Sequence, residues 1–353
     1  MNRPRPTRLL VVCPSWLGDG VMATPALRLL RDGLPGAFIG GLVRPGVDQI
    51  LDGAGFFDEV VTDRAQGMMG PKRVAARLRS HRFDGALLLT NSFSTALTTR
   101  LAFIRVRIGY DRDGRGILLT HRLQAPKDQS GRWSPIPAVS YYHHAARAVL
   151  EPIGSLPPFP PTELPSGAKL ELATTDEDER NADELLERAG IGKDERFAIL
   201  NPGGNNPAKR WPADRFASLV THLAHHHDLR VVVNGSPNER ELAESICADT
   251  SGVSLPALAP SLSTLKAIVR RSALMVTNDT GPRHIAAAFG VPLVSLFGPT
   301  DPRWTTIPAR ERIVVADPTL PHDQCADHHP VRCAIGRISI ERVVRAVDEL
   351  LSS

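Results

Sequence analysis

Short apolar runs alternate along the first half of the chain with longer segments in which apolar residues recur every three or four positions. The runs, which predict strands, are 9–13, 37–43, 59–62, 85–90 and 107–110. The segments between and after them, which predict helices, are 21–31, 47–53, 71–81, 94–102 and 141–150. Strands that alternate with helices form parallel sheets. We therefore expect an α/β fold.

The second half repeats this order of elements without obvious sequence identity to the first. Strands are predicted at 197–201, 230–234, 274–277 and 291–297, and helices at 176–189, 213–226, 238–249, 263–271 and 282–289. A last helix, 340–351, has its apolar residues spaced to face a core. Six prolines fall within 151–167, a density that excludes a helix or central strand and predicts an interdomain linker.

Length supports two domains, because 353 residues exceed the usual size of a single core. We expect an N-terminal domain at 1–150, the linker, a C-terminal domain at 168–336 and a terminal segment at 337–353. The apolar runs are too short for a transmembrane helix, and the run at 9–13 is too soon followed by Pro14 for a signal peptide. Four cysteines form no evident disulfide framework, so we expect a cytoplasmic protein.

Charge changes this picture little. The formal net charge is +4 and the isoelectric point about 9.0, which fits an anionic substrate or a membrane surface and equally fits no particular partner. We expect no nucleic-acid partner.

The turn at 14–20, after the first strand, contains Asp19 between Gly18 and Gly20. It lacks the Gly-x-Gly-x-x-Gly spacing of dinucleotide-binding loops, which argues against a nicotinamide enzyme. A carboxylate at a strand end is exposed to a ligand in the adjoining crevice. A helix cap for the segment from Val21 onward is the alternative.

Two loops of the second half suit phosphate binding. Residues 201–212 (NPGGNNPAKRWP) place Gly203, Gly204 and Lys209 before a helix. A lysine here is usually an ordinary surface residue, but a second helix start suited to phosphate follows in the same domain and favours the binding interpretation. In 275–302, the amides of Thr280 and Gly281 are expected at a helix N-terminus, with Asn278 or Asp279 as cap and Pro282 at the first helical position.

Glu239 follows the strand 230–234. A carboxylate at this position accepts hydrogen bonds from ribose hydroxyls in other doubly wound nucleotide sites. A first-turn acid favoured by the helix dipole is an equally good interpretation.

Several spaced motifs resemble the ADP-heptose:lipopolysaccharide heptosyltransferases of glycosyltransferase family 9. They are 9–27 (LLVVCPSWLGDGVMATPAL), 201–204 (NPGG), 209–212 (KRWP), 278–284 (NDTGPRH) and 297–302 (FGPTDP). The motifs 91–96 (NSFSTA) and 107–115 (RIGYDRDGR) resemble the heptosyltransferase II branch in particular.

The resemblance implies a GT-B architecture, with two Rossmann-like domains facing a central cleft, and a terminal helix that packs back on the N-terminal domain. It implies catalytic roles for Asp19, as general base, and Lys209, as a phosphate contact. The donor-binding residues it implies are Gly203, Lys209, Glu239, Asp279, Thr280, Gly281 and His284.

The implied reaction is an inverting transfer of heptose from ADP-heptose to a hydroxyl of the lipopolysaccharide inner core, as its second heptose. Neither a metal nor a cofactor is required. The implied acceptor is a phosphorylated lipid A-core at the inner leaflet, so peripheral membrane contact is compatible with a cytoplasmic, monomeric enzyme. We assign acceptor binding to Ser15, Gly18, Arg64, Lys72, Arg112 and Arg115, although any one of these basic residues is more often a solvated charge.

Other readings stay open from the sequence. A same-family enzyme with another nucleotide sugar or acceptor, a non-catalytic sugar-nucleotide-binding protein and a sugar-nucleotide epimerase share the fold and phosphate motifs. His222, His225, His226 and His227 suggest a metal, but no cysteine accompanies them. The segment with His322, Cys325, His328, His329 and Cys333 has no compact zinc spacing, and a plain loop is the preferred interpretation.

Overall fold

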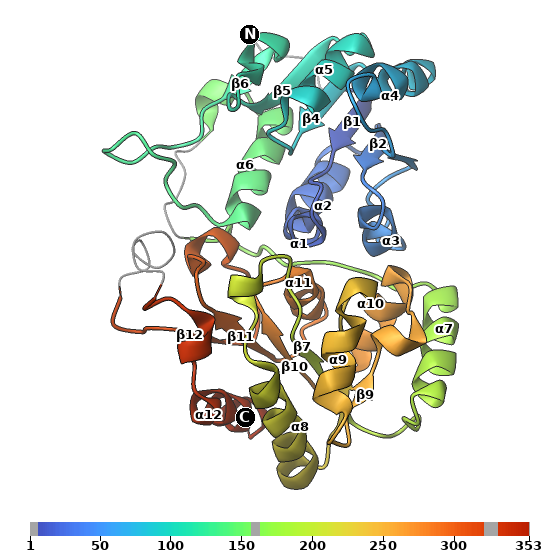
Figure 1. The fold of residues 1–353 in the computed structure, drawn as a ribbon. Coiled ribbons are helices and arrows are strands. Elements are labelled where there is room, and N and C mark those ends of the chain that lie inside the picture. The colour runs from blue at the N-terminus through green and yellow to red at the C-terminus, as the bar shows by residue number, and fades with distance from the viewer. Residues whose placement is uncertain (1–5, 157–162, 321–330, 353) are drawn as a thin grey trace. The chain divides into compact units, whose positions relative to one another are not determined.

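The computed structural model describes residues 6–156, 163–320 and 331–352. The chain forms two α/β units, each around its own six-stranded sheet (Figure 1). The first unit runs to Glu171 and includes Arg303–Ile307, and the second runs from Leu172 to Pro302 and resumes at Pro308. The predicted linker ends just before this division, and its residues 157–162 lie outside the described ranges.

The first sheet has the strand order β3-β2-β1-β4-β5-β6, with every described pairing parallel. Its strands are β1 (Arg8–Val12), β2 (Phe38–Val43), β3 (Glu59–Thr62), β4 (Gly85–Leu88), β5 (Val106–Tyr110) and β6 (His121–Leu123). Leu10 lies opposite Gly40 on one side and Ala86 on the other. A Cβ at Gly40 would lie 2.5 Å from the Phe83 ring, so glycine at this position makes room for that ring.

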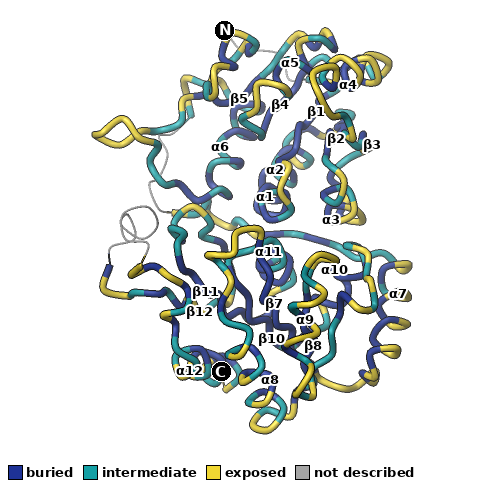
Figure 2. The backbone as a smooth tube through the Cα atoms, in the orientation of Figure 1, coloured by how far each residue is buried: buried dark blue, intermediate teal, exposed yellow. Residues whose placement is uncertain are grey.

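Helices cover both faces of the first sheet. They are α1 (Leu17–Met22), α2 (Thr24–Gly33), α3 (Val47–Leu51), α4 (Gly70–Leu78), α5 (Phe93–Leu101) and α6 (Ala138–Leu150). Leu10 and Val12 enter a cluster with residues of α4 and α5, whereas α2 and α6 pack against each other. Leu9 and Val11 alternate to the opposite face and are equally buried. Figure 2 shows the strands as the buried centre of the unit.

The second sheet has the order β12-β11-β10-β7-β8-β9, again all parallel. Its strands are β7 (Phe197–Asn201), β8 (Arg230–Val233), β9 (Val253–Ser254), β10 (Leu274–Asn278), β11 (Leu293–Phe297) and β12 (Glu311–Val315). Its helices are α7 (Asp176–Arg188), α8 (Ala213–His227), α9 (Arg240–Cys247), α10 (Leu262–Arg271), α11 (Gly281–Ala288) and α12 (Ile340–Leu351).

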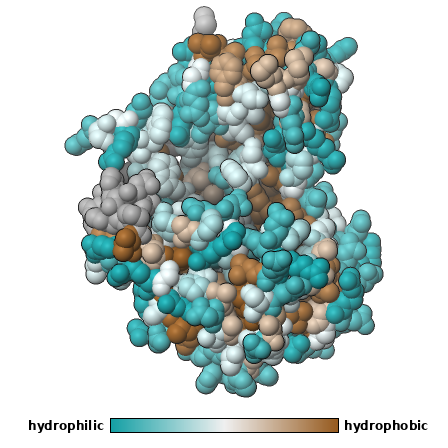
Figure 3. Space-filling view, in the orientation of Figure 1, coloured by the Kyte–Doolittle hydropathy of each residue, from teal (hydrophilic) through white to brown (hydrophobic). Residues whose placement is uncertain are grey.

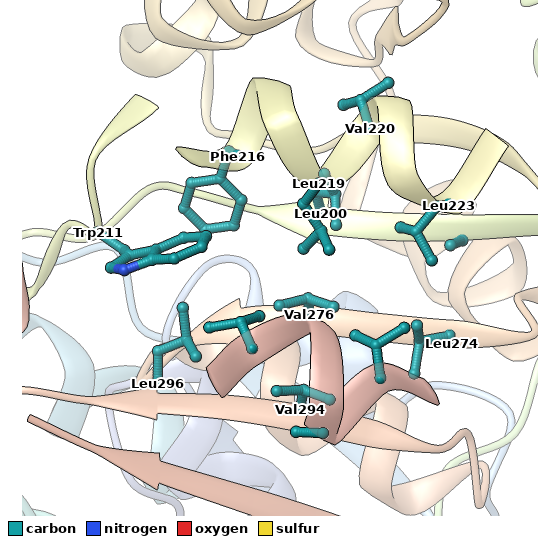
Figure 4. Packing of buried hydrophobic residues seen from close by; sticks show 14 of the residues in the cluster. Leu200, Trp211, Phe216, Leu219, Val220, Leu223, Leu274, Val276, Val294 and Leu296 are labelled. Carbon is teal, nitrogen blue, oxygen red and sulfur yellow. The ribbon is translucent and has the colours of Figure 1, made fainter. Parts of the chain in front are cut away.

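The largest described core of this unit lies between the sheet and α8, α9 and α12. In Figure 4, Phe216, Leu219 and Leu223 of α8 project toward Leu200 and Val276 of the strands, and Trp211 closes one end of the cluster. Such buried central strands read as continuous apolar runs, which is why the sequence revealed them.

The predicted alternation of strands and helices is confirmed, with the strands 59–62 and 197–201 at their predicted bounds. Three edge strands, β6, β9 and β12, were not predicted. Each has at most three consecutive apolar residues, fewer than the runs of the central strands. The single helix predicted at 21–31 is two helices, α1 and α2, which meet at Ala23.

The terminal helix corrects one prediction. We expected α12 to pack on the N-terminal domain, but its apolar face belongs to the core of the second unit, where it contacts α8, β11 and β12. Val343, Val347 and Leu350 are almost fully buried there. Its hydrophobic periodicity predicted a buried face but not the surface that covers it.

No helix in the described part of the chain is long and apolar enough to span a membrane. The face of the molecule in Figure 3 is largely hydrophilic, with hydrophobic residues in small separate areas.

Candidate functional site

Each sheet has a topological switch point beside its first strand. β1 lies between β2 and β4, and β7 lies between β8 and β10. Successive connections leave these first strands in opposite directions, so their carboxyl ends border the crevices in which doubly wound sheets bind ligands. The predicted donor loops follow β7, β8 and β10, and the predicted base follows β1.

Lys209 and Asp279 meet at the second switch point, although 70 residues separate them in sequence. Lys209 Nζ donates a hydrogen bond of 3.2 Å to Asp279 Oδ2. Burial acts to raise the pKa of Asp279, but the charges of Lys209 and Arg283 outweigh it and hold that pKa below its ordinary value. The carboxylate is therefore ionised and fixes the lysine ammonium, which is 27% exposed, at this edge of the sheet.

Asp279 is itself held from two other directions. Thr300, in the turn after β11, donates to Asp279 Oδ2 at 3.1 Å, and Arg283 Nη1 lies 3.7 Å from Oδ1. The fully buried Arg283 is paired with Glu311 at 2.7 Å. This network joins the loops after β10 and β11 to the edge strand β12.

Buried asparagines shape the two donor loops, a role that the sequence did not reveal. Asn201, the last residue of β7, donates to Thr280 Oγ1 at 2.8 Å and accepts from Asn234 at 2.8 Å. Asn278, the last residue of β10, donates to the carbonyl oxygens of Pro202 at 2.6 Å and Gly203 at 3.2 Å. The sequence did contain a signal for this role, because an asparagine stands at the end of β7, directly after β8 and at the end of β10.

Glu239 is used by the protein itself. Its carboxylate accepts from the backbone amides of Gly204 at 2.7 Å and Ser236 at 2.8 Å, and from the Ser236 hydroxyl. Burial acts to raise the pKa of Glu239, but these hydrogen bonds outweigh it and lower that pKa. The helix-start interpretation is thus confirmed by a capping box, and the carboxylate also fixes the Gly203–Gly204 loop.

Gly203 is required by this arrangement. A Cβ there would lie 2.4 Å from the Glu239 carboxylate, a distance that forces the two groups apart.

Thr280 and Gly281 begin α11, with Thr280 as the N-cap residue. The expected cap by Asn278 or Asp279 is wrong, because Asn278 ends β10 and Asp279 pairs with Lys209 instead. Both Thr280 and Gly281 are half-buried at the end of the helix, where amides lack intrahelical acceptors.

His284 lies one turn into α11 and is 3% exposed. Burial, aided by the neighbouring Arg283, lowers its pKa to about 3, so the ring is neutral. Its Nδ1 has no hydrogen-bond partner among the residues the structure describes. The donor-binding role of His284 stays a prediction.

The first switch point holds a pocket of about 400 Å³. Its walls come from the carboxyl ends of β1 and β2, the residues that follow β4, and the start of α4. Ser15, a predicted acceptor residue, lines it, together with Arg44, which sequence reasoning missed. Arg44 follows β2 directly, and its guanidinium is fixed by the carbonyl oxygens of Asp63 at 3.1 Å and Ala65 at 3.2 Å.

Asp19 lies in the first turn of α1 and not in an open turn. The cap interpretation is wrong, since Trp16 holds the N-cap position. Asp19 Oδ1 accepts a hydrogen bond of 2.8 Å from the hydroxyl of Tyr142, which comes from α6. Burial, followed by the charge of Asp19, raises the pKa of Tyr142 well above its ordinary value, so the hydroxyl stays protonated and donates.

The basic residues predicted to bind the acceptor are not gathered in one place. Arg115 is buried, and its guanidinium donates to the carbonyl oxygens of Tyr110, at 2.9 Å, and Thr90. Burial lowers its pKa to about 10. Arg115 therefore has a structural role in the loops after β4 and β5.

The remaining predicted acceptor residues lie outside the pocket lining. Arg112 stacks on Trp133, with its guanidinium carbon 4.2 Å from the ring centroid. Arg64 and Lys72 are exposed, and Gly18 is buried in α1. None of these four lines the pocket described above, and their acceptor roles stay predictions.

Two doubly wound, parallel six-stranded sheets define a GT-B fold, and charged and amide groups lie at the switch point of the second sheet. Residues 72–332 match glycosyltransferase family 9 (heptosyltransferase). The chain belongs to this family and is a glycosyltransferase.

Similar proteins carry the same assignment. Lipopolysaccharide heptosyltransferase 2 of Salmonella typhimurium is 30% identical over 312 residues, which cover 84% of each chain. The structure of E. coli ADP-heptose lps heptosyltransferase II superposes with a TM-score of 0.79 at 24% identity, covering 98% of each chain. E. coli heptosyltransferase WaaC with ADP-2-deoxy-2-fluoro heptose gives a TM-score of 0.67 at 20% identity, covering 97% of this chain and 99% of that one.

Proposed function

We propose that this protein transfers heptose from ADP-heptose to a hydroxyl of the lipopolysaccharide inner core, as the second heptose and with inversion of configuration. The observation that carries the proposal is the convergence of Lys209, Asp279 and the loop after β7 at one switch point. Family membership and the 30% identity to a lipopolysaccharide heptosyltransferase 2 support the substrate class.

In the donor site, the diphosphate would lie between Lys209 and the amides of Thr280 and Gly281. Lysine supplies a point charge and the helix N-terminus supplies oriented amides, the two kinds of group that bind phosphates in such loops. As the bond between the anomeric carbon and the diphosphate breaks, negative charge grows on the leaving ADP. A well-placed donor lowers the barrier of such a step by roughly 3–4 kcal/mol.

In the acceptor site, the sugar hydroxyl attacks the anomeric carbon from the face opposite the diphosphate. A new C–O bond forms, the bond to ADP breaks, and the hydroxyl proton passes to Asp19. A carboxylate is one of the side chains that act as a general base in such a step. The Tyr142 hydroxyl donates to Asp19 Oδ1 and so fixes the orientation of this carboxylate.

The pocket beside β1 is the proposed seat of the acceptor. Its volume is in the range of small-molecule sites. Arg44 borders it with a guanidinium that suits phosphate or carboxylate groups of a phosphorylated core.

We further propose that the protein acts as a monomer at the cytoplasmic face of the inner membrane and needs neither metal nor cofactor for transfer. Met68 and Met69 are 97% and 52% exposed, and Lys72 and Arg73, also exposed, follow them at the start of α4. Apolar side chains beside cations suit a surface with anionic lipid headgroups.

Mass spectrometry of a defined core acceptor tests the assignment. An acceptor with one heptose, incubated with ADP-heptose, should gain the mass of one heptose, and an acceptor without heptose should react far more slowly. Asp19→Asn should keep ADP binding and lose turnover. Transfer from a competing nucleotide sugar would show that the protein is a different transferase. Binding of ADP-heptose without any transfer to the acceptor would show that it is a binding protein.

A further inference from the structure

We propose that the C-terminal unit contains a site for a divalent transition-metal cation, such as Zn²⁺, formed by His222, His227 and Asp348. The two histidines lie in the last turns of α8, and Asp348 lies in α12. Their ligand atoms all fall within 4.8 Å of one another. The sequence showed the histidines but not their partner, since 126 residues separate His222 from Asp348.

Both imidazoles point at the same carboxylate oxygen. His222 Nε2 lies 2.8 Å and His227 Nε2 lies 2.7 Å from Asp348 Oδ1. Two imidazole nitrogens and one carboxylate oxygen are ligands that Zn²⁺ uses when it keeps a fourth position for water.

The geometry needs only a small opening to hold the cation. Zn²⁺ bonds of about 2.0–2.2 Å place tetrahedral ligand atoms roughly 3.4 Å apart. The nitrogen–oxygen distances of 2.7 and 2.8 Å must therefore widen by about 0.6 to 0.7 Å. The three side chains retain 18%, 19% and 45% of their exposure, so side-chain rotation suffices for this change.

Solvent reaches the cluster from the side of α12. A shallow pocket on this helix is lined by Asp348 together with Val344, Arg345 and Glu349. Neither histidine lines this pocket, so a coordinating water would reach the cation past Asp348. Hydrogen bonds among His222, His227 and Asp348 without a metal would also pair these polar groups. A metal site and a purely hydrogen-bonded cluster differ in their affinity for Zn²⁺.

The position of the site argues for a structural metal. The histidines lie at the C-terminal end of α8, whereas Lys209 precedes its N-terminal end. Fifteen residues of α-helix span about 22 Å. The cation would therefore join α12 to α8 without reaching the donor loops, and it would resist separation of the terminal helix from the core.

Zinc content of the untagged full-length protein tests the site. After equilibrium dialysis against micromolar Zn²⁺, the wild type should hold one Zn²⁺ at this site. His222→Gln, His227→Gln and Asp348→Asn should each weaken that binding by at least roughly tenfold. His225→Gln, at an exposed neighbouring position of α8, is the matched control and should bind as the wild type does. Zn²⁺ should raise the Tm of the wild type and the control but not of the three variants.

The histidines and cysteines at 322–333 are a competing source of zinc binding. The variant Cys325→Ser/His329→Ala separates the two, because the proposed site requires it to keep the zinc that His222→Gln loses. Zinc that disappears in this variant but persists in His222→Gln would overturn the proposal, as would a wild-type protein that binds no Zn²⁺. Co²⁺ substitution supplies a second readout, since its visible spectrum should change in Asp348→Asn even where the fold, followed by circular dichroism, is intact.

Discussion

Tyr142 and Asp19 form a contact that makes the proposed base dependent on a residue of another helix. The Tyr142 hydroxyl is buried with the aspartate as its acceptor. A hydrogen bond to a charged group contributes about 1.5–3 kcal/mol. If the orientation of Asp19 matters only in the transition state, Tyr142→Phe should lower kcat by about tenfold or more and leave the KM for ADP-heptose unchanged.

The neighbouring Tyr141 provides the control for this experiment. Its hydroxyl donates to Asn91 Oδ1 at 3.0 Å and its ring stacks on Tyr110, so Tyr141→Phe removes a similar hydrogen bond from the same helix. That variant should keep a higher kcat than Tyr142→Phe. Equal losses in the two variants would show a general effect on α6 and remove Tyr142 as a positioning residue.

His284 makes the second unit sensitive to acid. Its folded pKa of about 3 lies below the ordinary value of 6.5, so the unfolded chain binds the extra proton first. Its contribution to stability is complete above pH 6.5 and is lost progressively as pH falls toward 3. Between these limits, His284→Leu should gain stability relative to wild type by about 1.4 kcal/mol per pH unit.

Urea unfolding at several pH values measures this difference. His225→Gln, at an exposed position of α8, is the control variant. A constant difference between wild type and His284→Leu from pH 7 to pH 4 would contradict a buried neutral ring.

At the scale of elements, Arg115 joins the loops that follow β4 and β5. It donates to Tyr110 O, to Thr90 O and, at 3.3 Å, to Asn91 Oδ1. In Arg115→Met, Tyr110 O keeps the amide of Arg112 and Asn91 Oδ1 keeps the hydroxyl of Tyr141, whereas Thr90 O loses the guanidinium. A buried oxygen left without a donor costs about 1–3 kcal/mol, and we expect the first unit to lose unfolding free energy of this order.

Denaturant unfolding of Arg115→Met checks this prediction, with Arg64→Met as the matched control. Arg64 is exposed, so its replacement should change stability by less than about 0.5 kcal/mol. A variant Arg115→Met as stable as the control would show that the buried guanidinium is dispensable.

For the whole molecule, the two units have separate cores, one around β1 and β4 and the other around β7 and β10. The proposed ADP contacts all lie in the second unit. Calorimetry should therefore resolve two transitions, and ADP at 100 times its Kd should stabilise one of them by about 2.7 kcal/mol. For a unit of this size that corresponds to a shift of roughly 5 to 10 °C.

Lys209→Ala is the control for the calorimetric experiment, because it should abolish most of the shift while leaving both transitions in place. A single transition, or an equal shift of both, would contradict donor binding by one unit alone.

Much of the fold was predictable because buried parallel strands and amphipathic helices have local patterns. The strand 197–201 and the helix 340–351 were found at their exact bounds from spacing alone. Edge strands such as β6 were not, since half of each faces solvent and carries polar residues. The candidate site was partly predictable, because Lys209, Asp279 and Thr280 lie in loops that follow predicted strands, where charged and polar residues suggest phosphate binding.

Sequence alone determined most of the helices and central strands, the two-unit organisation and the family, since each rests on patterns within a few dozen residues or on motifs in order. Only the tertiary structure decided the partners: Tyr142 for Asp19, Asp279 for Lys209, backbone carbonyls for Arg115 and Asp348 for His222. Tyr142 and Asp19 lie 123 residues apart, and His222 and Asp348 lie 126 apart. Side chains so far apart in sequence meet only because the order of the strands and the packing of the helices bring them together. Local hydrophobic periodicity does not predict such contacts.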